Sequence, residues 1–300
     1  MGIGREAFYL LAQLNSLERF ENKSVLQLGK QSGITSKKQI LSIGKIFDIK
    51  FNYTPESKYN FYRNYPTGDQ IFQNLGFKII DSIDVSDYEG ANIVHDLNTE
   101  IPENFTTGYD LVFDGGTTEH LFDQLTVLKN LHKLLKVGGI IVHSTPANNY
   151  LDHGYFQPQP SFYYEYYLAN GYEIVQSYLI ESTSNFYQRR RVYEYKPLLY
   201  EHLSYGGWGG RMIGNWFAFK KLQTSTSGKI PQQQRYTDYL YVYNKPEANT
   251  RRHYLMLKIF FEKHPALKYY VLRIKHWFVK FLRSISHLHN SNRPKPLFLA

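Results

Sequence analysis

The feature that most constrains the fold is a series of short apolar runs, each with a glycine or an acidic residue near its end. Four runs cover residues 24–29, 78–85, 91–98 and 109–116, and a fifth over 140–146 is broken by Pro146. Runs of this length and composition are typical of strands buried on both faces. Because helical segments separate them, we expect the strands to pair in parallel through right-handed crossovers. The sequence therefore predicts a Rossmann-like α/β fold, a mainly parallel sheet with helices on both faces.

Helical periodicity surrounds these runs. Residues 1–20 predict an amphipathic first helix, residues 69–77 a helix that stops at Gly76, and residues 121–139 a longer helix that ends at two glycines. After Pro146 we expect an aromatic loop, a helix over about 161–170 and two further strands over 172–180 and 212–222. Segments 34–77 and 181–210 are interpreted as insertions into this core.

The charge distribution sets the C-terminal part of the chain apart. The net charge is +9, yet residues 251–300 hold eleven Lys or Arg against a single acidic residue, Glu262. We therefore divide the chain into a core over 1–222, a linker over 223–245 and a basic, amphipathic helical tail over 246–300. Such a tail is suited to contact an anionic membrane surface or a protein partner through residues 251–285. It is equally suited to pack on its own core with the lysine ammonium groups reaching water.

Composition excludes several classes of site. The chain contains no cysteine, so it has no disulfide, no thiolate metal site and no cysteine nucleophile. Its first residues are too polar for a signal peptide, and no stretch of about 18 apolar residues is present to span a membrane. We therefore expect a cytoplasmic protein, with peripheral membrane contact left open. The histidines are scattered along the sequence, so no metal site is expected.

Candidate site residues follow from where a parallel sheet binds ligands. Ligands lie outside the carboxyl ends of the strands, which places Gly29, Asp84, Asp96 and Asp114 at the expected site. A nucleoside cofactor needs close backbone approach after the first strand, an acid for its ribose after the second and a polar contact to its base after the third. Gly29, Asp84 and Asp96 suit these roles in that order. The same residues also fit a strand-ending glycine and solvated or helix-capping acids.

Four segments together resemble a known family. VLQLGKQSG, IDSIDVSDYEGANIVHDLN, YDLVFDGGTTEHLFD and KVGGIIVHSTPANN are similar to successive motifs of class I S-adenosylmethionine (SAM)-dependent methyltransferases, in particular the type 11/12 kind. The resemblance covers about residues 20–220 and implies the methyltransferase form of the Rossmann-like fold, with SAM as cofactor. It implies cofactor contacts from Gly29, Gln31, Asp84, Asp96, Leu97, Asp114 and Gly115.

The first motif departs from the family pattern. The wider family carries an acidic residue and a Gly-x-Gly-x-Gly loop there, whereas this chain has Gln27 in the place of the acid. Only Gly29 and Gly33 remain of the glycines, with Lys30 and Gln31 between them. The resemblance implies a variant cofactor loop.

Two histidines are candidate catalytic residues. The Glu119-His120 pair follows the fourth strand, as in many members of the family, and His120 is placed to act as a base if the acceptor must lose a proton. The pair also fits a structural role in orienting the following helix. His153 lies in an aromatic, polar loop after the fifth strand, where the family often contacts its acceptor. That loop also fits a packing role.

Three functions compete at this point. The leading one is a SAM-dependent methyltransferase acting on an unidentified acceptor, a small molecule or a glycan-related one. The alternative is a non-catalytic Rossmann-like scaffold that has lost the acidic first motif. A nucleic-acid methyltransferase is suggested only by the basic tail and the aromatic content, and we do not expect a nucleic-acid partner.

Overall fold

The computed structural model describes residues 2–52, 65–103, 105, 108–183, 190–204, 206–234 and 236, scattered positions from 267 to 278, and residues 296–299. The chain divides into two compact units. The first comprises Met1–Pro197, Gly210–Pro231 and Pro296–Ala300, and the second comprises Leu198–Gly209 and Gln232–Lys295. Everything below on the sheet and the candidate site concerns the first unit.

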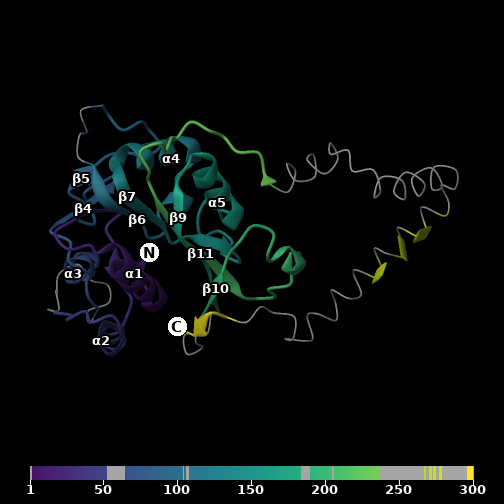
Figure 1. Ribbon diagram of the computed structural model, residues 1–300, viewed down its shortest axis with the longest axis horizontal. Coiled ribbons are helices and arrows are strands. Elements are labelled where there is room, and N and C mark those ends of the chain that lie inside the picture. The colour runs from purple at the N-terminus through teal and green to yellow at the C-terminus, as the bar shows by residue number, and fades with distance from the viewer. Residues whose placement is uncertain are drawn as a thin grey trace. The chain divides into compact units, whose positions relative to one another are not determined.

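One sheet forms the frame of the first unit (Figure 1). Its strand order is β12-β10-β9-β11-β7-β6-β2-β4-β5, and β8 pairs with β11. The half from β7 to β5 is entirely parallel. It contains β2 (Ser24–Leu28), β4 (Ile79–Asp84), β5 (Ile93–Val94), β6 (Tyr109–Asp114) and β7 (Leu135–His143).

The other half of the sheet is antiparallel. The long strand β11 lies between β7 and β9 and runs against both. This half contains β8 (Pro146–Asn148), β9 (Glu173–Ser182), β10 (Arg191–Glu194), β11 (Met212–Lys220) and β12 (Phe298–Leu299). The parallel half, wound outward in both directions from β2, is the Rossmann-like arrangement that the sequence predicted.

Helices cover the sheet on both faces (Figure 1). The helices are α1 (Arg5–Glu18), α2 (Lys37–Ile46), α3 (Gly68–Asn74), α4 (Gln124–Leu134) and α5 (Pro160–Ala169), with a short 3-10 helix η1 (Thr118–His120) after β6. A two-stranded parallel pair, β1 (Gly2–Ile3) with β3 (Ser32–Gly33), lies beside the main sheet. The predicted α/β layers are therefore present.

Alternation along the strands divides the core between the two faces, because successive side chains of a strand point to opposite sides. Phe113, Val142 and Trp216 are buried against α1, α2 and α3 in one cluster. On the other face, Phe219 stacks on Tyr167 of α5 with ring centroids 4.3 Å apart. Strands this apolar on both faces explain the continuous apolar runs in the sequence.

Three predicted boundaries are corrected. The strand expected over 91–98 pairs only at Ile93–Val94. The helix expected over 121–139 ends at Leu134, because Leu135 already pairs with Tyr109 in the sheet and the two glycines lie inside β7. Helix α2 falls within the segment 34–77, for which no helix before residue 69 is predicted, and it begins with a capping box at Ser36. In each case sheet pairing or capping outweighed the local apolar pattern.

The predicted tail lies mostly outside the described residues. The described positions Leu267, Tyr270, Val271, Ile274, Trp277 and Phe278 are helical and exposed. Their spacing is that of one helix face, as expected for an amphipathic segment. The predicted domain boundaries at 222 and 245 stay predictions.

We expect Leu11→Ala to destabilise the first unit strongly. Leu11 is fully buried in the cluster between α1 and the sheet, so its truncation should lower the free energy of unfolding by about 2–5 kcal/mol. Leu17→Ala is the matched control, because Leu17 lies on the same helix and is 63% exposed; its effect should stay within about 0.5 kcal/mol. Urea unfolding of both variants checks this, and equal effects would contradict the packing of α1 on the sheet.

Candidate functional site

The carboxyl edge of the parallel half brings three predicted residues into one row. Leu28 pairs with Ile83 and Asp84 pairs with Val94, so Gly29, Asp84 and Asp96 follow one another across neighbouring strands. The Gly29 N–H donates to the Ile83 carbonyl at 2.8 Å. The tertiary structure therefore assembles the edge that the sequence predicted.

Gly29 occupies a crowded turn in which its glycine backbone is required. Its φ is +67°, a left-handed conformation that favours glycine. A Cβ at this position would lie 3.2 Å from Thr117 Oγ1 and 3.5 Å from Asp84 Oδ2. Polar groups from β4 and from the turn after β6 therefore converge on the backbone of Gly29.

The altered first motif is held by a carboxylate from outside the motif. Gln27, buried in β2, donates from Nε2 to Asp69 at 2.7 Å, and Lys30 forms an ion pair with the same carboxylate at 2.6 Å. Asp69 lies in the first turn of α3, where the helix dipole favours a negative charge. An acid thus reaches this loop from α3, although the strand itself carries an amide.

Gln31 is folded inward beneath the loop. Its Nε2 donates to the Leu28 carbonyl at 2.7 Å, while its buried Oε1 has no hydrogen-bond partner among the described residues. A Cβ on Gly115 would lie 2.3 Å from this Oε1, so the glycine after β6 makes room for the Gln31 side chain. A buried amide oxygen without a donor is costly. It offers a place for a ligand N–H or O–H.

Asp96 and Leu97 lie in the turn after β5. Asp96 Oδ1 accepts hydrogen bonds from the backbone and side-chain nitrogens of Asn98, both at 2.9 Å. Leu97 is buried, and its carbonyl accepts from Asn130 of α4 at 3.0 Å. Both residues are at the predicted edge, and their contact with a cofactor stays a prediction.

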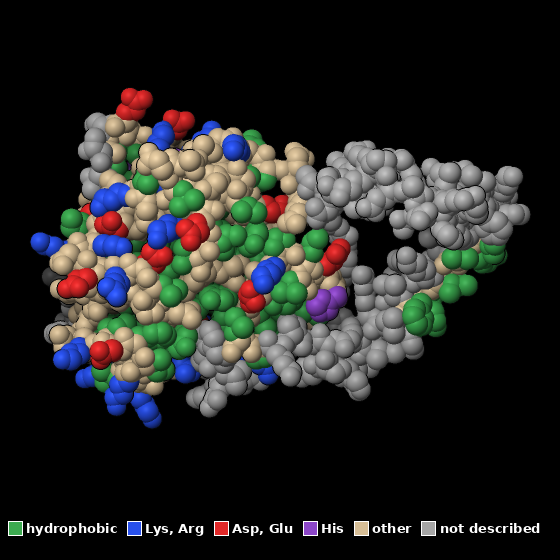
Figure 2. All heavy atoms as spheres, in the orientation of Figure 1, with side chains coloured by type: hydrophobic (Ala, Val, Ile, Leu, Met, Phe, Trp, Pro, Cys, Tyr) green, Lys and Arg blue, Asp and Glu red, His purple; other side chains and the backbone are tan. Residues whose placement is uncertain are grey.

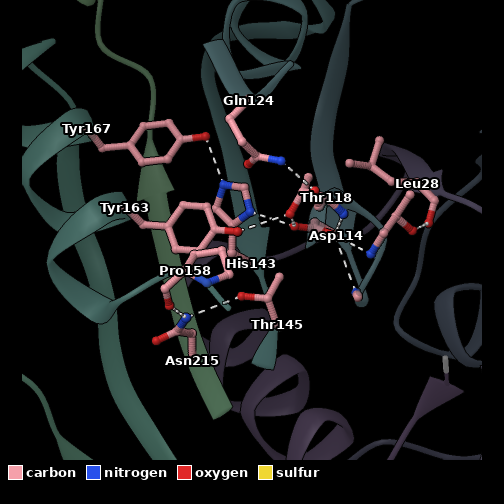
Figure 3. Close-up of polar contacts among 12 residues, drawn as sticks. Leu28, Asp114, Thr118, Gln124, His143, Thr145, Pro158, Tyr163, Tyr167 and Asn215 are labelled. Atoms are coloured by element: carbon pink, nitrogen blue, oxygen red, sulfur yellow. Dashed lines mark hydrogen bonds and ion pairs between the residues drawn. The ribbon is translucent and has the colours of Figure 1, made fainter. Parts of the chain in front are cut away.

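Asp114 is the most heavily bonded carboxylate of the site (Figure 3). Its Oδ1 accepts from the backbone N–H groups of Gly116, Thr117 and Thr118 at 2.9–3.3 Å. Its Oδ2 accepts from the Thr118 hydroxyl at 2.6 Å and from His143 Nδ1 at 2.7 Å. Burial alone would raise the pKa of Asp114, but the His143 contact and these other donors hold it below its ordinary value. The contact of Asp114 with a cofactor stays a prediction. In the structure, its hydrogen bonds fix the conformation of the turn after β6.

A polar chain extends from Asp114 toward α5 (Figure 3). Asp114 Oδ2 accepts a hydrogen bond from His143 Nδ1, and His143 Nε2 lies 2.9 Å from the Tyr167 hydroxyl, within hydrogen-bond distance. Tyr163 lies 3.0 Å from the Thr118 hydroxyl and stacks on the His143 ring at 4.1 Å. Burial raises the pKa of both tyrosines well above their ordinary value, so they keep their protons.

The predicted catalytic histidines meet on one buried carboxylate. His153 Nε2 lies 3.8 Å and His120 Nε2 lies 4.0 Å from Glu119 Oε1, and the two imidazole rings are 5.3 Å apart. Burial, and then the charge of Asp114, raises the pKa of Glu119 to about 8. Burial, and then the neighbouring His153, lowers the pKa of His120. The two histidines are far apart in sequence, and only the fold brings them together.

Sequence reasoning missed two contributors to the site. Asp69 carries a weak signal, since it follows the capping residue Thr67 of α3. His143 ends β7 at the same sheet edge as the other candidates, and the rule on strand ends would have selected it. His143 belongs to an otherwise continuous apolar run, which favours a strand interior over a strand end.

Comparison with known proteins gives fold neighbours only. No protein-family model and no curated protein matches the chain. Among solved structures, the chain is similar to a 1,6-didemethyltoxoflavin-N1-methyltransferase of Burkholderia thailandensis, with 12% identity over 73% of this chain and 80% of that one and a TM-score of 0.38. It is similar to the MccD protein, with 12% identity, 72% and 98% coverage and a TM-score of 0.39. A coclaurine N-methyltransferase shares 12% identity, with 72% and 71% coverage and a TM-score of 0.34. These values are too low to transfer the role of any residue, so the site is interpreted from this chain alone.

We expect Asp114→Asn to lower the free energy of unfolding by about 1.5–3 kcal/mol at pH 7. The neutral amide cannot accept charge-assisted hydrogen bonds from both Thr118 and His143. The folded-state pKa of Asp114 is depressed. Its stabilisation is therefore present above the pKa of an unfolded aspartate and is lost as the pH falls through the folded pKa. Urea unfolding at several pH values measures this. The difference in free energy of unfolding between wild type and variant should become smaller as the pH is lowered.

Asp123→Asn is the control for that experiment. Asp123 is an exposed cap of α4 that accepts from the Thr126 N–H at 3.1 Å, and asparagine caps helices equally well. A variant of Asp114 no less stable than this control would contradict the role of the buried carboxylate.

Proposed function

We propose that this protein is a SAM-dependent methyltransferase acting on a small-molecule or glycan-related acceptor. SAM would bind along the carboxyl edge of β2, β4 and β5. The observation that carries the proposal is the row of Gly29, Asp84 and Asp96, set by strand register. Close backbone approach, a carboxylate and a further polar residue stand there in the order that a nucleoside requires.

The chemistry of the loop fits such a cofactor. The left-handed turn at Gly29 leaves no side chain between the backbone and a ligand. Asp84 has a carboxylate oxygen within reach of that turn, suited to accept from ribose hydroxyls. The unpartnered Oε1 of Gln31 is suited to accept from an amino or hydroxyl group of the cofactor.

The contact of Asp69 with Gln27 and Lys30 favours catalysis over the scaffold alternative. Loss of the acidic first motif was the main argument for a non-catalytic protein. A carboxylate from α3 bonds Gln27 and Lys30, so this loop has an acid fixed beside it. This contact supports the proposal that the altered motif is a variant cofactor loop.

SAM, when bound, would supply the methyl group on a reactive sulfonium, with S-adenosylhomocysteine as the leaving group. The protein's contribution is to position the acceptor, since in-line displacement depends strongly on orientation. His120 and His153 are proposed to face the acceptor, because both are partly exposed beside the loop after β8. The aromatic rings of Phe122 and Tyr155 meet edge to face at 5.7 Å in the same region and suit a planar or sugar-like acceptor.

A nucleic-acid acceptor has less support. On the face shown in Figure 2, acidic and basic side chains are interspersed over most of the described part of the chain, with basic side chains gathered at its lower left edge. A nucleic-acid surface would gather lysines and arginines.

Within the described residues, no helix is both long and apolar enough to cross a bilayer. The cytoplasm remains the proposed location, with which a cysteine-free chain is compatible.

We expect Asp84→Ala to raise the Kd for SAM and for S-adenosylhomocysteine by about tenfold or more, since a hydrogen bond to a charged group contributes about 1.5–3 kcal/mol. Isothermal titration of both ligands measures this. Glu103→Ala is the control, because it removes an exposed carboxylate from the segment leading into β6 and should leave the Kd unchanged. If the wild-type protein binds neither ligand at millimolar concentration, the scaffold alternative replaces this proposal.

A further inference from the structure

Glu119, His120 and His153 have side-chain atoms close enough together to hold a metal ion. One nitrogen from each histidine and one carboxylate oxygen lie within 4.8 Å of one another, the only such set of at least three histidine, cysteine or acidic side chains among the described residues. The cluster lies beside the turn after β6, apart from the Gly29, Asp84 and Asp96 row. Nothing in the proposed handling of SAM uses the Glu119 carboxyl.

The Glu119 carboxyl is buried without a hydrogen-bond partner among the described residues. Its side chain is fully buried, and neither carboxyl oxygen has a hydrogen-bond partner among the described residues. A buried acid normally pairs with donors or binds a metal. A carboxylate at this position is deprived of water and of compensating charge. A cation at this position would supply the missing charge.

The backbone holds the two halves of the cluster together. The Phe156 N–H donates to the Glu119 carbonyl at 3.1 Å. A Cβ on Gly154 would lie 2.9 Å from that carbonyl and 3.1 Å from Glu119 Cγ, so only glycine lets the loop approach this closely. His153, next in the chain, is thereby fixed against the acid. The Asp114 turn positions η1, and with it Glu119 and His120, from the other side.

We infer that Glu119, His120 and His153 form a three-ligand site for a divalent transition metal of the zinc, iron or manganese class. Two imidazoles and one carboxylate are ligands that such ions prefer. A tetrahedral ion with bonds of about 2.1 Å separates its ligand atoms by about 3.4 Å. The present separations of 3.8 and 4.0 Å from Glu119 Oε1 need only small side-chain rotations to reach that value.

The site is accessible and incomplete, as a reactive metal site requires. The side chains of His120 and His153 are 47% and 35% exposed, so an ion can enter. Three protein ligands leave at least one position for water or for an acceptor oxygen. If a metal is bound, both histidines would be its ligands, and it would supply Lewis-acid activation of the acceptor in place of a histidine base. The metal site itself does not depend on methyl transfer or on SAM.

The test is titration of the full-length, metal-free protein with Zn²⁺ by calorimetry and with Co²⁺ by its visible absorption. Glu119→Gln keeps the shape of the side chain and removes its charge, and His153→Ala removes a ligand from a partly exposed loop. Each variant should weaken metal binding by at least about tenfold. His202→Ala, which removes an exposed histidine of the second unit, should bind like wild type.

Urea unfolding of the same proteins separates ligand loss from misfolding. Zn²⁺ should raise the unfolding midpoint of wild type and of His202→Ala, and leave that of Glu119→Gln nearly unchanged. Equal Zn²⁺ affinity in all four proteins, or no saturable site in wild type, would overturn the inference. The wild type and the variants are also titrated with SAM. If the wild type binds Zn²⁺ but does not bind SAM, the proposed function is refuted and the metal site stands.

Discussion

The carboxylate of Asp114 is the interaction on which the rest of the site depends. It ends β6 without exposure to water, and five donors from the next four residues and from β7 satisfy it. Through Thr117, whose hydroxyl donates to the Leu28 carbonyl at 2.6 Å, it ties this turn to the end of β2. Through Thr118 it sets the start of η1. The edge formed by Gly29, Asp84 and Asp96 and the histidine cluster therefore share one anchor.

The buried polar groups of this edge divide into satisfied and unsatisfied ones. Asp114 and His143 are saturated by protein donors and acceptors, which is typical of groups that maintain a shape. Gln31 Oε1 and the Glu119 carboxyl lack partners among the described residues. Because burying an unpaired polar group is costly, such groups point to ligands that complete them. This contrast underlies the two proposals, in which Gln31 belongs to a cofactor loop and Glu119 to a metal site.

The antiparallel half of the sheet supports this chemistry from the side. Insertion of β11 between β7 and β9 brings Asn215 to Thr145 and to the carbonyl of Pro158, with hydrogen bonds at 3.3 and 2.9 Å (Figure 3). These contacts fasten the segment 145–158, which contains β8 and the loop after it, to the sheet at both of its ends. That loop carries His153, so the sheet's order determines where the second imidazole can lie.

The sequence by itself determined the layers and the edge. Apolar runs buried on both faces predict the parallel half of the sheet, and strand ends then place Gly29, Asp84 and Asp96 at one edge. Tertiary structure decided what depends on contacts between distant segments. Strand pairing starts β7 early, at Leu135 against Tyr109. Packing brings the α3 carboxylate of Asp69 to Gln27 and the ring of His120 to that of His153. No local pattern reports such contacts, because each residue is compatible with several environments until the fold supplies its neighbours.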